Sequence, residues 1–181
     1  WADEADEGTE VEDVKLWIFD ADKGSMIEEK HYGSTEEVAS QRFQLPEGTY
    51  RIQTFSNLTE PFFISEQTRA QTNWNNILIG LTNPKDVRNN AYFGVTDVKI
   101  DNKEGNYVVQ NPKKKVLAEL TIIIENIPKG TEMSGKALDC AMCLFPTQKN
   151  SDGDYGLPSI EPTEVELPTL LATESTLKSE V

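Results

Sequence analysis

Apolar and polar residues alternate with a period of two along several short stretches of the chain, which is typical of β-strands. The segment 14–19 is apolar on both faces, because Trp17 and Phe19 lie opposite its aliphatic residues. The longest alternation runs over 116–126. We expect this segment to form a central strand with at least one buried face and to pair with 136–145.

Other alternating segments are separated by turns rich in glycine and proline, such as Pro46–Gly48. Ser34–Val38 instead opens like a short capped helical turn. Strands are therefore predicted at 14–19, 25–31, 49–55, 91–100, 106–110, 116–126 and 136–145. About seven strands of this kind predict an all-β domain with the architecture of a β-sandwich.

The region 56–90 does not follow this pattern. It is rich in Asn, Thr and Gln, and its compact apolar run is Leu78–Leu81. We expect a long, partly helical loop there, and loops of such length are usually functional.

The two ends of the chain differ from its middle. Residues 1–13 are mostly acidic and predict a flexible leader. Residues 14–146 are predicted to form the β-sandwich domain. In 147–181 three prolines interrupt a sparsely apolar sequence, so we expect a linker with an edge strand, or the start of a second β domain.

Charge and length narrow the classes of function. The 181 residues carry a formal net charge of −14, a field that repels phosphate backbones and makes nucleic acid an improbable partner. No apolar run reaches the length of a membrane-spanning helix. The chain begins at Trp1 without a Met, which indicates a mature or trimmed form.

The sequence predicts no catalytic, cofactor or metal residues. His31 is the single histidine and falls on a predicted edge strand or turn, where it is expected to be solvated. Cys140 and Cys143 form a CxxC pattern inside a predicted strand. Residues three apart on a strand point to opposite faces, so we expect two reduced, partly buried thiols rather than a redox pair.

A calcium-loop pattern also occurs. Asn150, Asp152, Asp154 and Glu161 match loop positions 1, 3, 5 and 12, but Tyr155 stands where the motif needs glycine. A polar loop is the preferred interpretation.

Aromatic residues offer a possible sugar-stacking platform. The candidates are Trp17, Trp74, Tyr92 and Phe93. Trp17 and Phe93 lie in predicted strands and are expected in the core. Trp74, among asparagines, is the better candidate for an exposed ring. The basic run Lys113–Lys115 is expected to end a solvated hairpin.

Four segments together resemble the fimbrillin-associated anchor family of anaerobic Gram-negative bacteria. They are Val14–Gly24, Leu45–Asn57, Tyr92–Gly94 and Val116–Pro128, which resemble the family's first strand and turn, its Pro-x-Gly-x-Tyr strand, the segment after its long excursion, and its long strand ending in Asn-x-Pro. The resemblance implies a transthyretin-like, Greek-key β-sandwich. It also implies an exported lipoprotein held in the outer membrane, although the family's lipidated cysteine is absent here.

The resemblance further implies a structural role at the cell surface. We expect an anchor or accessory subunit of a fimbria that supports adhesion, is not an enzyme and needs no cofactor. Its partners would be other fimbrial subunits, joined by strand exchange or edge pairing. A role as a stalk or tip subunit of a fimbria is also consistent with the resemblance. The alternatives are a surface glycan-binding module that uses Trp74, with a host or glycan ligand, and a secreted hydrolase.

Overall fold

The computed structural model describes residues 11–65, 72–83, 90–101, 107–117, 121–159, 163–167, 169–171 and 176–180. Two compact units share the chain. Unit one comprises Trp1–Val116 and Cys143–Pro158, and unit two comprises Leu117–Met142 and Ser159–Val181. The chain thus leaves unit one after Val116, returns to it at Cys143, and leaves it again after Pro158.

The described residues of unit one form nine strands and two short helices. The strands are β1 (Val14–Asp20), β2 (Met26–Tyr32), β3 (Gly48–Ser56), β4 (Phe62–Ile64), β5 (Ile79–Leu81), β6 (Tyr92–Ile100), β7 (Lys114–Lys115), β11 (Cys143–Lys149) and β12 (Tyr155–Pro158). The helices are α1 (Thr35–Ala39) and the 3₁₀ turn η1 (Trp74–Asn76). The prediction of an all-β fold is confirmed.

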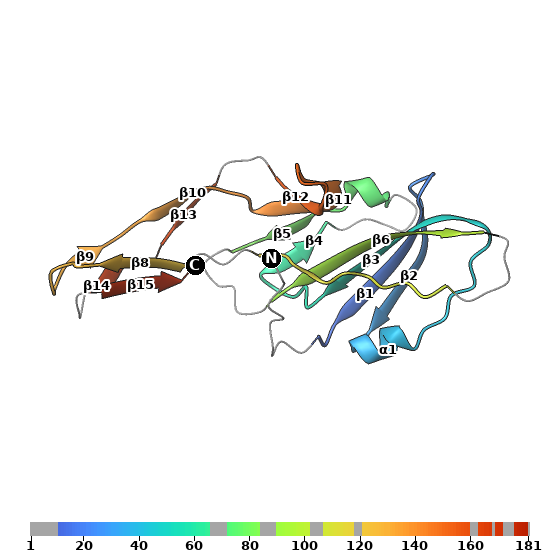
Figure 1. Ribbon diagram of the computed structural model, residues 1–181, viewed down its shortest axis with the longest axis horizontal. Coiled ribbons are helices and arrows are strands. Elements are labelled where there is room, and N and C mark those ends of the chain that lie inside the picture. The colour runs from blue at the N-terminus through green and yellow to red at the C-terminus, as the bar shows by residue number, and fades with distance from the viewer. Residues whose placement is uncertain are drawn as a thin grey trace. The chain divides into compact units, whose positions relative to one another are not determined.

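The strands of unit one form two antiparallel sheets (Figure 1). Sheet one has the order β2-β1-β3-β6-β7, and sheet two has the order β12-β11-β5-β4. The β3–β6 ladder is the longest and runs without interruption from Gly48 opposite Ile100 to Ser56 opposite Tyr92. This register places Arg51 directly opposite Asp97.

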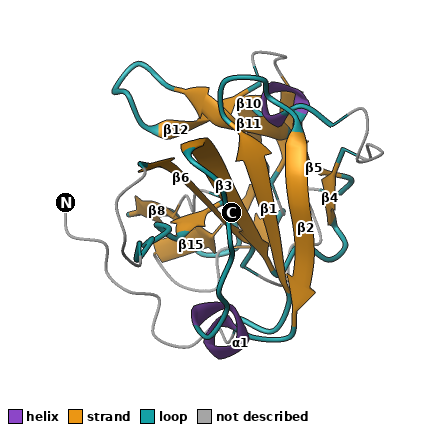
Figure 2. Ribbon diagram, turned by 90° about the vertical axis from the view of Figure 1, so that its right-hand side faces the viewer, coloured by secondary structure: helices purple, strands orange, loops and turns teal. Residues whose placement is uncertain are grey.

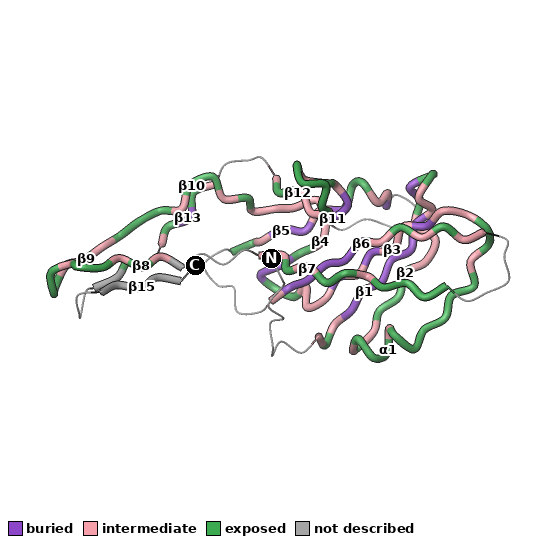
Figure 3. Tube along the Cα trace, in the orientation of Figure 1, coloured by how far each residue is buried: buried purple, intermediate pink, exposed green. Residues whose placement is uncertain are grey.

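The core of unit one lies between the two sheets. Trp17, Phe19, Phe55, Phe93 and Val95 of sheet one pack with Ile77 and Ile79, which lie at and beside β5. Trp17 and Phe55 meet edge to face, with ring centroids 5.1 Å apart. Burial follows β1, β3 and the first half of β6 (Figure 3). Both sheets therefore contribute to one inter-sheet core, as expected of a sandwich.

Sheet one is also apolar on its outer face, as the sequence of 14–19 predicts. Leu16, Ile18 and Tyr50 form a second buried cluster, and Val38 of α1 packs against it. The helix begins with a side-chain cap, because the Glu37 N–H donates to Ser34 Oγ at 3.3 Å. Figure 2 shows α1 where the chain leaves β2. The predicted helical turn is confirmed.

Unit two consists of three short antiparallel ladders. Its strands are β8 (Thr121–Glu125), β9 (Glu132–Met133), β10 (Lys136–Cys140), β13 (Thr163–Glu166), β14 (Leu170–Leu171) and β15 (Thr176–Glu180). The pairs are β8 with β15, β9 with β14 and β10 with β13. The segment 163–180 therefore runs back along 121–140 in the opposite direction.

This pairing corrects the prediction for the segment 116–126. In the described part of the chain β8 pairs with β15, not with 136–145, and it is not a central strand of the sandwich. Ile122 and Ile124 are half-buried, and Ile123 is 58% exposed. The alternation identified the strand, but its partner lies more than 50 residues away in sequence, which a period of two cannot reveal.

The two units also divide the chain differently from the predicted spans 14–146 and 147–181. Residues 143–158 form the β11–β12 hairpin of sheet two, so the sandwich extends to Pro158. Residues 117–142 lie in unit two instead. Within the described residues, β12 is the outermost strand of sheet two.

The predicted return strand at 106–110 is likewise corrected where it is described. Residues 107–113 are not in a strand, and β7 is the segment that pairs with Tyr92 and Phe93. The chain at 110–112 instead crosses the outer face of sheet one, where the Thr96 hydroxyl donates to the Gln110 carbonyl. Gly94 permits this crossing, since a Cβ there would lie 2.2 Å from the Pro112 carbonyl oxygen.

Candidate functional site

A polar cluster lies on the inner face of sheet one, next to the apolar core. Arg51 of β3 and Asp97 of β6 share this face with Phe55 and Val95, because side chains alternate along each strand. Arg51 Nε donates to Asp97 Oδ1 at 2.7 Å, and Nη2 donates to Oδ2 at 2.8 Å. This two-pronged geometry fixes the guanidinium plane.

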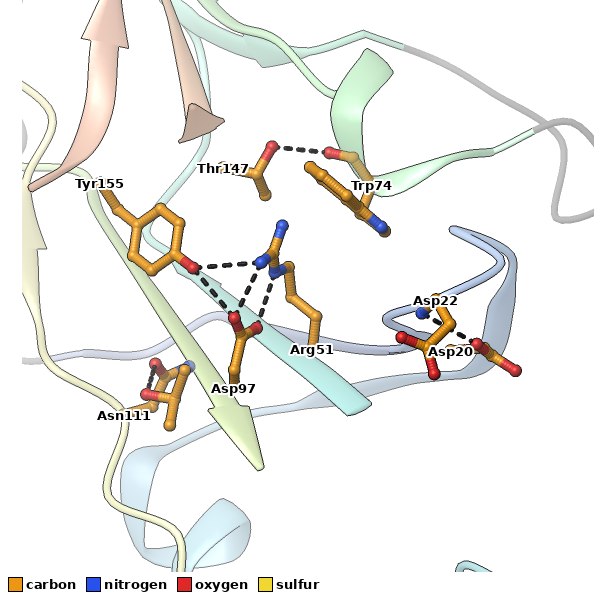
Figure 4. Close-up of polar contacts among 9 residues, drawn as sticks. Asp20, Asp22, Arg51, Trp74, Asp97, Asn111, Thr147 and Tyr155 are labelled. Atoms are coloured by element: carbon orange, nitrogen blue, oxygen red, sulfur yellow. Dashed lines mark hydrogen bonds and ion pairs between the residues drawn. The ribbon is translucent and has the colours of Figure 1, made fainter. Parts of the chain in front are cut away.

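Two aromatic side chains from elsewhere in unit one complete the cluster. Arg51 lies over the Trp74 ring, 4.0 Å from its centroid, and 5.4 Å from that of Tyr155. The Tyr155 hydroxyl donates to Asp97 and accepts from Arg51, both at 3.1 Å. Figure 4 shows the guanidinium between the two aromatic side chains. We call Arg51, Trp74, Asp97 and Tyr155 the Arg51 cluster.

The cluster joins parts of the chain that are distant in sequence. Trp74 belongs to η1, in the long excursion, and Tyr155 begins β12. The Thr147 hydroxyl of β11 donates to the Trp74 carbonyl at 2.8 Å. Gly156 lies against Phe93, where a Cβ would approach the ring to 2.7 Å. These contacts hold η1 and the β11–β12 hairpin against sheet one.

The electrostatics of the cluster follow from this pairing. Hydrogen bonds from Arg51, followed by its charge and the Tyr155 hydroxyl, hold the pKa of Asp97 below its ordinary value, although burial opposes the shift. The same hydrogen bonds raise the pKa of Arg51. Burial raises the pKa of Tyr155, so its hydroxyl stays protonated and able to donate.

Two lysines extend the cluster toward solvent. Lys149 Nζ lies 5.0 Å from the centroid of the Tyr155 ring, and Lys149 is exposed. Lys114 Nζ contacts the Tyr155 carbonyl at 3.3 Å and Asp154 Oδ1 at 3.5 Å. Arg51 and Lys149 thus lie near the Tyr155 ring, and Lys114 contacts the Tyr155 backbone, in a chain whose net charge is −14.

The aromatic residues that were candidates for a sugar-stacking platform lie in different environments. Trp17 and Phe93 are core residues, as predicted. Tyr92 is buried, with Lys113 Nζ 3.7 Å from its ring centroid. Trp74 is half-buried rather than exposed, and Arg51 covers one face of its ring. The four aromatic side chains therefore do not present one open stacking surface.

The remaining candidates take other roles. His31 lies on β2, an outer strand of sheet one, and its exposed ring contacts the Asp13 carboxylate. Cys140 ends β10, Cys143 begins β11, and both are half-buried thiols that form no disulfide within the described residues, as predicted. They belong to two strands rather than to one, because the chain is irregular between them.

The calcium-loop pattern forms the tip of a hairpin. Asn150 Oδ1 accepts the backbone N–H groups of Asp152 and Asp154, which turns the chain between β11 and β12. This oxygen is engaged by the loop itself. Glu161 lies outside the described residues. Across the described ranges, no three His, Cys, Asp or Glu side chains are arranged to hold a metal ion.

A cavity of about 380 Å³ lies within unit two. It is lined by Ser134, Gly135, Lys136, Glu166, Leu167 and Thr169. Lys136 pairs with Glu164 at 3.0 Å, and both side chains are more than half exposed. The charged lining residue Lys136 is therefore paired outside the lining, and the cavity offers no evident chemistry.

Sequence reasoning missed Arg51, Asp97 and Tyr155. A signal was present, because Arg51 alternates in register with Phe55, and Asp97 with Phe93 and Val95. Opposite charges at inward positions of two strands indicate a cross-strand ion pair. The register that brings them together could not be read from either strand alone.

The chain is similar to known proteins in its sequence family and in its fold. The model of a family described as fimbrillin-A-associated anchor proteins Mfa1 and Mfa2 matches residues 1–162. No curated protein sequence matches the chain.

Solved structures with a similar fold include the fimbrial anchor protein Mfa2 from Porphyromonas gingivalis, at a TM-score of 0.68 and 14% identity, over 96% of this chain and 64% of that one. A candidate polysaccharide-binding protein from Bacteroides thetaiotaomicron matches at 0.62 and 10% identity, over 95% and 63%. A candidate adhesin from Bacteroides ovatus matches at 0.59 and 14% identity, over 95% and 59%. The chain spans less than two thirds of each of these proteins, and identities this low establish the fold alone.

Proposed function

The chain belongs to the family of fimbrillin-A-associated anchor proteins, and from this membership we propose that it is an anchor subunit of a bacterial surface fimbria. The observation that carries the proposal is the family match over 162 of 181 residues. The all-β sandwich agrees with it, since such sheets suit assembly by strand pairing. The role is structural and supports adhesion, without catalysis.

Open sheet edges supply the physical means of assembly. Strand β4 is an edge strand of sheet two. Every second residue along it is hydrogen-bonded to the β5 side: the Thr82 N–H donates to the Pro61 carbonyl, and the Ser65 N–H donates to the Leu78 carbonyl. Ile64 falls between these bonded pairs, so its N–H and C=O point away from β5. Outward backbone groups of this kind accept a strand from another subunit.

The proposed location is the outer membrane, reached by export. None of the helices in the described residues is long and apolar enough to cross a membrane. We infer attachment through a lipid on a residue outside this sequence, as the family resemblance implies.

Unit two fits a second β domain. Among the described residues of that unit, Val165 is the one apolar side chain that is buried. More than a third of each of these solved relatives lies outside the part that this chain matches. We propose that unit two is part of a second domain whose core needs further strands.

The anchor role is tested by measuring whether filaments are attached to cells or released into the medium. Deleting the gene should leave filaments assembled but released into the medium, and the full-length protein should restore them to washed cells. Electron microscopy and immunoblotting of both fractions measure this. Loss of all filaments would indicate a stalk subunit instead, and filaments retained on cells in normal number would refute the proposal.

The edge-pairing part has its own test. Ile64→Pro removes an N–H that points away from β5, so the sandwich should still fold while co-purification with fimbrial subunits falls. Ile64→Val keeps the N–H and serves as the matched control. Equal co-purification of both variants would place the contact at another edge.

A further inference from the structure

Strand β6 leaves most of its outer edge without a neighbouring strand. In the described part of the chain, β7 pairs with only the first two residues of β6, which continues to Ile100. The Val116 N–H donates to the Ala91 carbonyl at 2.8 Å, so the odd-numbered residues of β6 point their N–H and C=O groups away from β3. Beyond the pairing with β7, the residues with this orientation are Val95, Asp97 and Lys99.

The register of β7 explains where its pairing with β6 stops. If the ladder continued past Phe93, Pro112 would lie opposite Val95 at a hydrogen-bonded position. Proline has no N–H to donate there. The chain instead crosses the outer face next to Gly94, where a Cβ would lie 2.2 Å from the Pro112 carbonyl oxygen. Pro112 therefore interrupts the ladder at one residue and leaves the residues that precede it able to pair.

The residues that precede Pro112 fit the open edge in the same register. We call residues 107–111 the strap. Continuation of the β7 pairing places Gln110 opposite Asp97 and Val108 opposite Lys99, both at hydrogen-bonded positions. The strap is not in a strand, and its Val108 side chain is 88% exposed. Its tyrosine and two valines are residue types that favour strands.

Both ends of the strap are held close to β6. At one end, the N–H of Asp101, one residue after β6, donates to the Tyr107 hydroxyl at 3.2 Å. At the other end, β7 begins at Lys114 and is already paired with β6. Pairing of the strap therefore requires movement of the backbone between these ends and leaves sheet one in place.

The described contacts that hold the strap on the outer face each involve a side chain. Asn111 Nδ2 donates to Thr54 Oγ1 at 3.0 Å, and the Thr96 hydroxyl donates to the Gln110 carbonyl at 3.1 Å. Pairing with β6 exchanges these contacts for backbone hydrogen bonds at two positions of the edge. Since each hydrogen bond makes a small net contribution, the two positions of the strap lie close in free energy.

We propose that the strap exchanges between two positions, on the outer face of sheet one and along β6 as an extension of β7. On the outer face, it leaves the β6 edge free to receive a strand from another chain. Paired with β6, it closes this edge. The strap thus regulates an edge of sheet one that is separate from the β4 edge, and its exchange does not depend on the anchor role.

Amide hydrogen exchange followed by NMR tests the paired position. Gly94→Ala places a methyl group against the Pro112 carbonyl oxygen, so the strap cannot stay on the outer face. The Asp97 and Lys99 amides should then exchange about tenfold more slowly, the factor that corresponds to about 1.4 kcal/mol of hydrogen bonding. The Val98 amide faces β3 in both positions and should be unchanged.

Asn111→Ala is a milder second variant, because it removes the side-chain bond to Thr54 and adds no atoms. It should slow exchange of the same two amides by a smaller factor. Gln110→Ala is the matched control, since the contact of this residue with Thr96 uses its backbone carbonyl. It should exchange as the native chain does.

Thermal unfolding shows which of these variants fold. Gly94→Ala decides the question if it folds, and Asn111→Ala decides it otherwise. Unchanged or faster exchange of the Asp97 and Lys99 amides in the deciding variant would refute the paired position.

A disulfide tests whether the paired strap closes the edge. Val98→Cys and Val109→Cys face each other at a non-hydrogen-bonded position of the extended register, where side chains approach to disulfide distance. Both natural cysteines are replaced by serine. A synthetic peptide of residues 107–116 should shift the Asp97 and Lys99 amide resonances of the reduced chain but not of the oxidised one. A scrambled peptide of the same composition is the control for charge and should shift neither.

The absence of a shift in the reduced chain would show that the edge accepts no strand. Equal shifts in the reduced and oxidised chains would show that the strap does not cover it. Either result overturns the regulation of this edge. Fimbria retention in Asn111→Ala cells should be normal, which separates failure of the strap from failure of the anchor role.

Discussion

Units one and two are both built from antiparallel strands, yet they differ in how these strands are stabilised. In unit one, two sheets enclose a cluster of seven buried apolar residues among those the structure describes, with Phe19 fully buried. In unit two, each ladder has two strands, and the exposed large apolar side chains include Ile123 and Leu138. Two-stranded ladders are marginal in water unless another layer covers a face. Strand pairing alone therefore does not give unit two the stability of unit one.

The largest expected effect comes from where the chain is cut. A chain ending at Met142 loses β11 and β12, which form half of sheet two, so unit one should unfold. A chain ending at Pro158 keeps all of unit one and loses only the partners of 121–140. Circular dichroism and urea titration should show cooperative unfolding of the longer fragment only.

Hydrogen exchange on the longer fragment extends this test. Amides in 121–140 should lose protection, because their ladder partners are absent, while those of β1 and β3 keep it. Cooperative folding of the chain that ends at Met142 would mean that β11 and β12 are not part of the sandwich core.

Matched core substitutions compare the units at the level of one side chain. Phe19→Ala should destabilise unit one by about 3–5 kcal/mol, because it removes a fully buried ring. Ile123→Ala should cost less than about 1 kcal/mol, since more than half of that side chain is already in water. Urea unfolding followed by tryptophan fluorescence and by far-ultraviolet dichroism measures both. Similar costs would indicate that another layer buries β8 in solution.

The same comparison explains what the sequence could predict. The sequence predicts β1, β3 and β6 because each lies in an apolar or alternating segment of at least six residues, 14–19, 49–55 and 91–100. The structure buries each of these strands on one or both faces. Strands β4 and β5 have three residues each, too few to show a period. The predicted boundary after residue 146 falls inside β11, because the sequence after Thr147 is polar and interrupted by prolines at 158, 162 and 168. Pro146 is buried at an irregularity of β11, where the ladder to β12 shifts register and a proline is tolerated.

Partners distant in sequence account for the rest. The Arg51 cluster depends on β12 reaching β3 across 104 residues. The β8–β15 ladder depends on a similar long return. Local pattern specifies that a strand forms and which residues share a face, but the choice of neighbour is made by the packing of the whole chain.

A smaller effect is expected from the polar contacts that hold the hairpin. Arg51→Met leaves Asp97 without its main partner and should destabilise unit one by about 1.5–3 kcal/mol, the range of hydrogen bonds to charged groups. Arg51→Lys should recover part of this loss. Urea unfolding measures both, and hydrogen exchange should show the change in β11 and β12 but not in 121–140. A loss spread equally over both units would contradict a local role.

The smallest expected effect is a pH dependence confined to unit one. Because Arg51 holds the pKa of Asp97 below its ordinary value of 3.8, the carboxylate contributes stability that is complete above this value. The contribution is lost as the pH falls through the lowered pKa. The urea midpoint of the native chain, measured from about pH 5 to pH 2, should therefore fall more steeply below about pH 4 than that of Asp97→Asn, which cannot titrate there. The difference should be modest, because Asp97 is partly exposed and solvent screens the pair. Exchange in 121–140 should respond equally in the two proteins, since Asp97 belongs to unit one. Parallel acid limbs in the native chain and Asp97→Asn would show that other carboxylates govern the acid response, and that the Arg51 cluster does not set the stability of unit one at low pH.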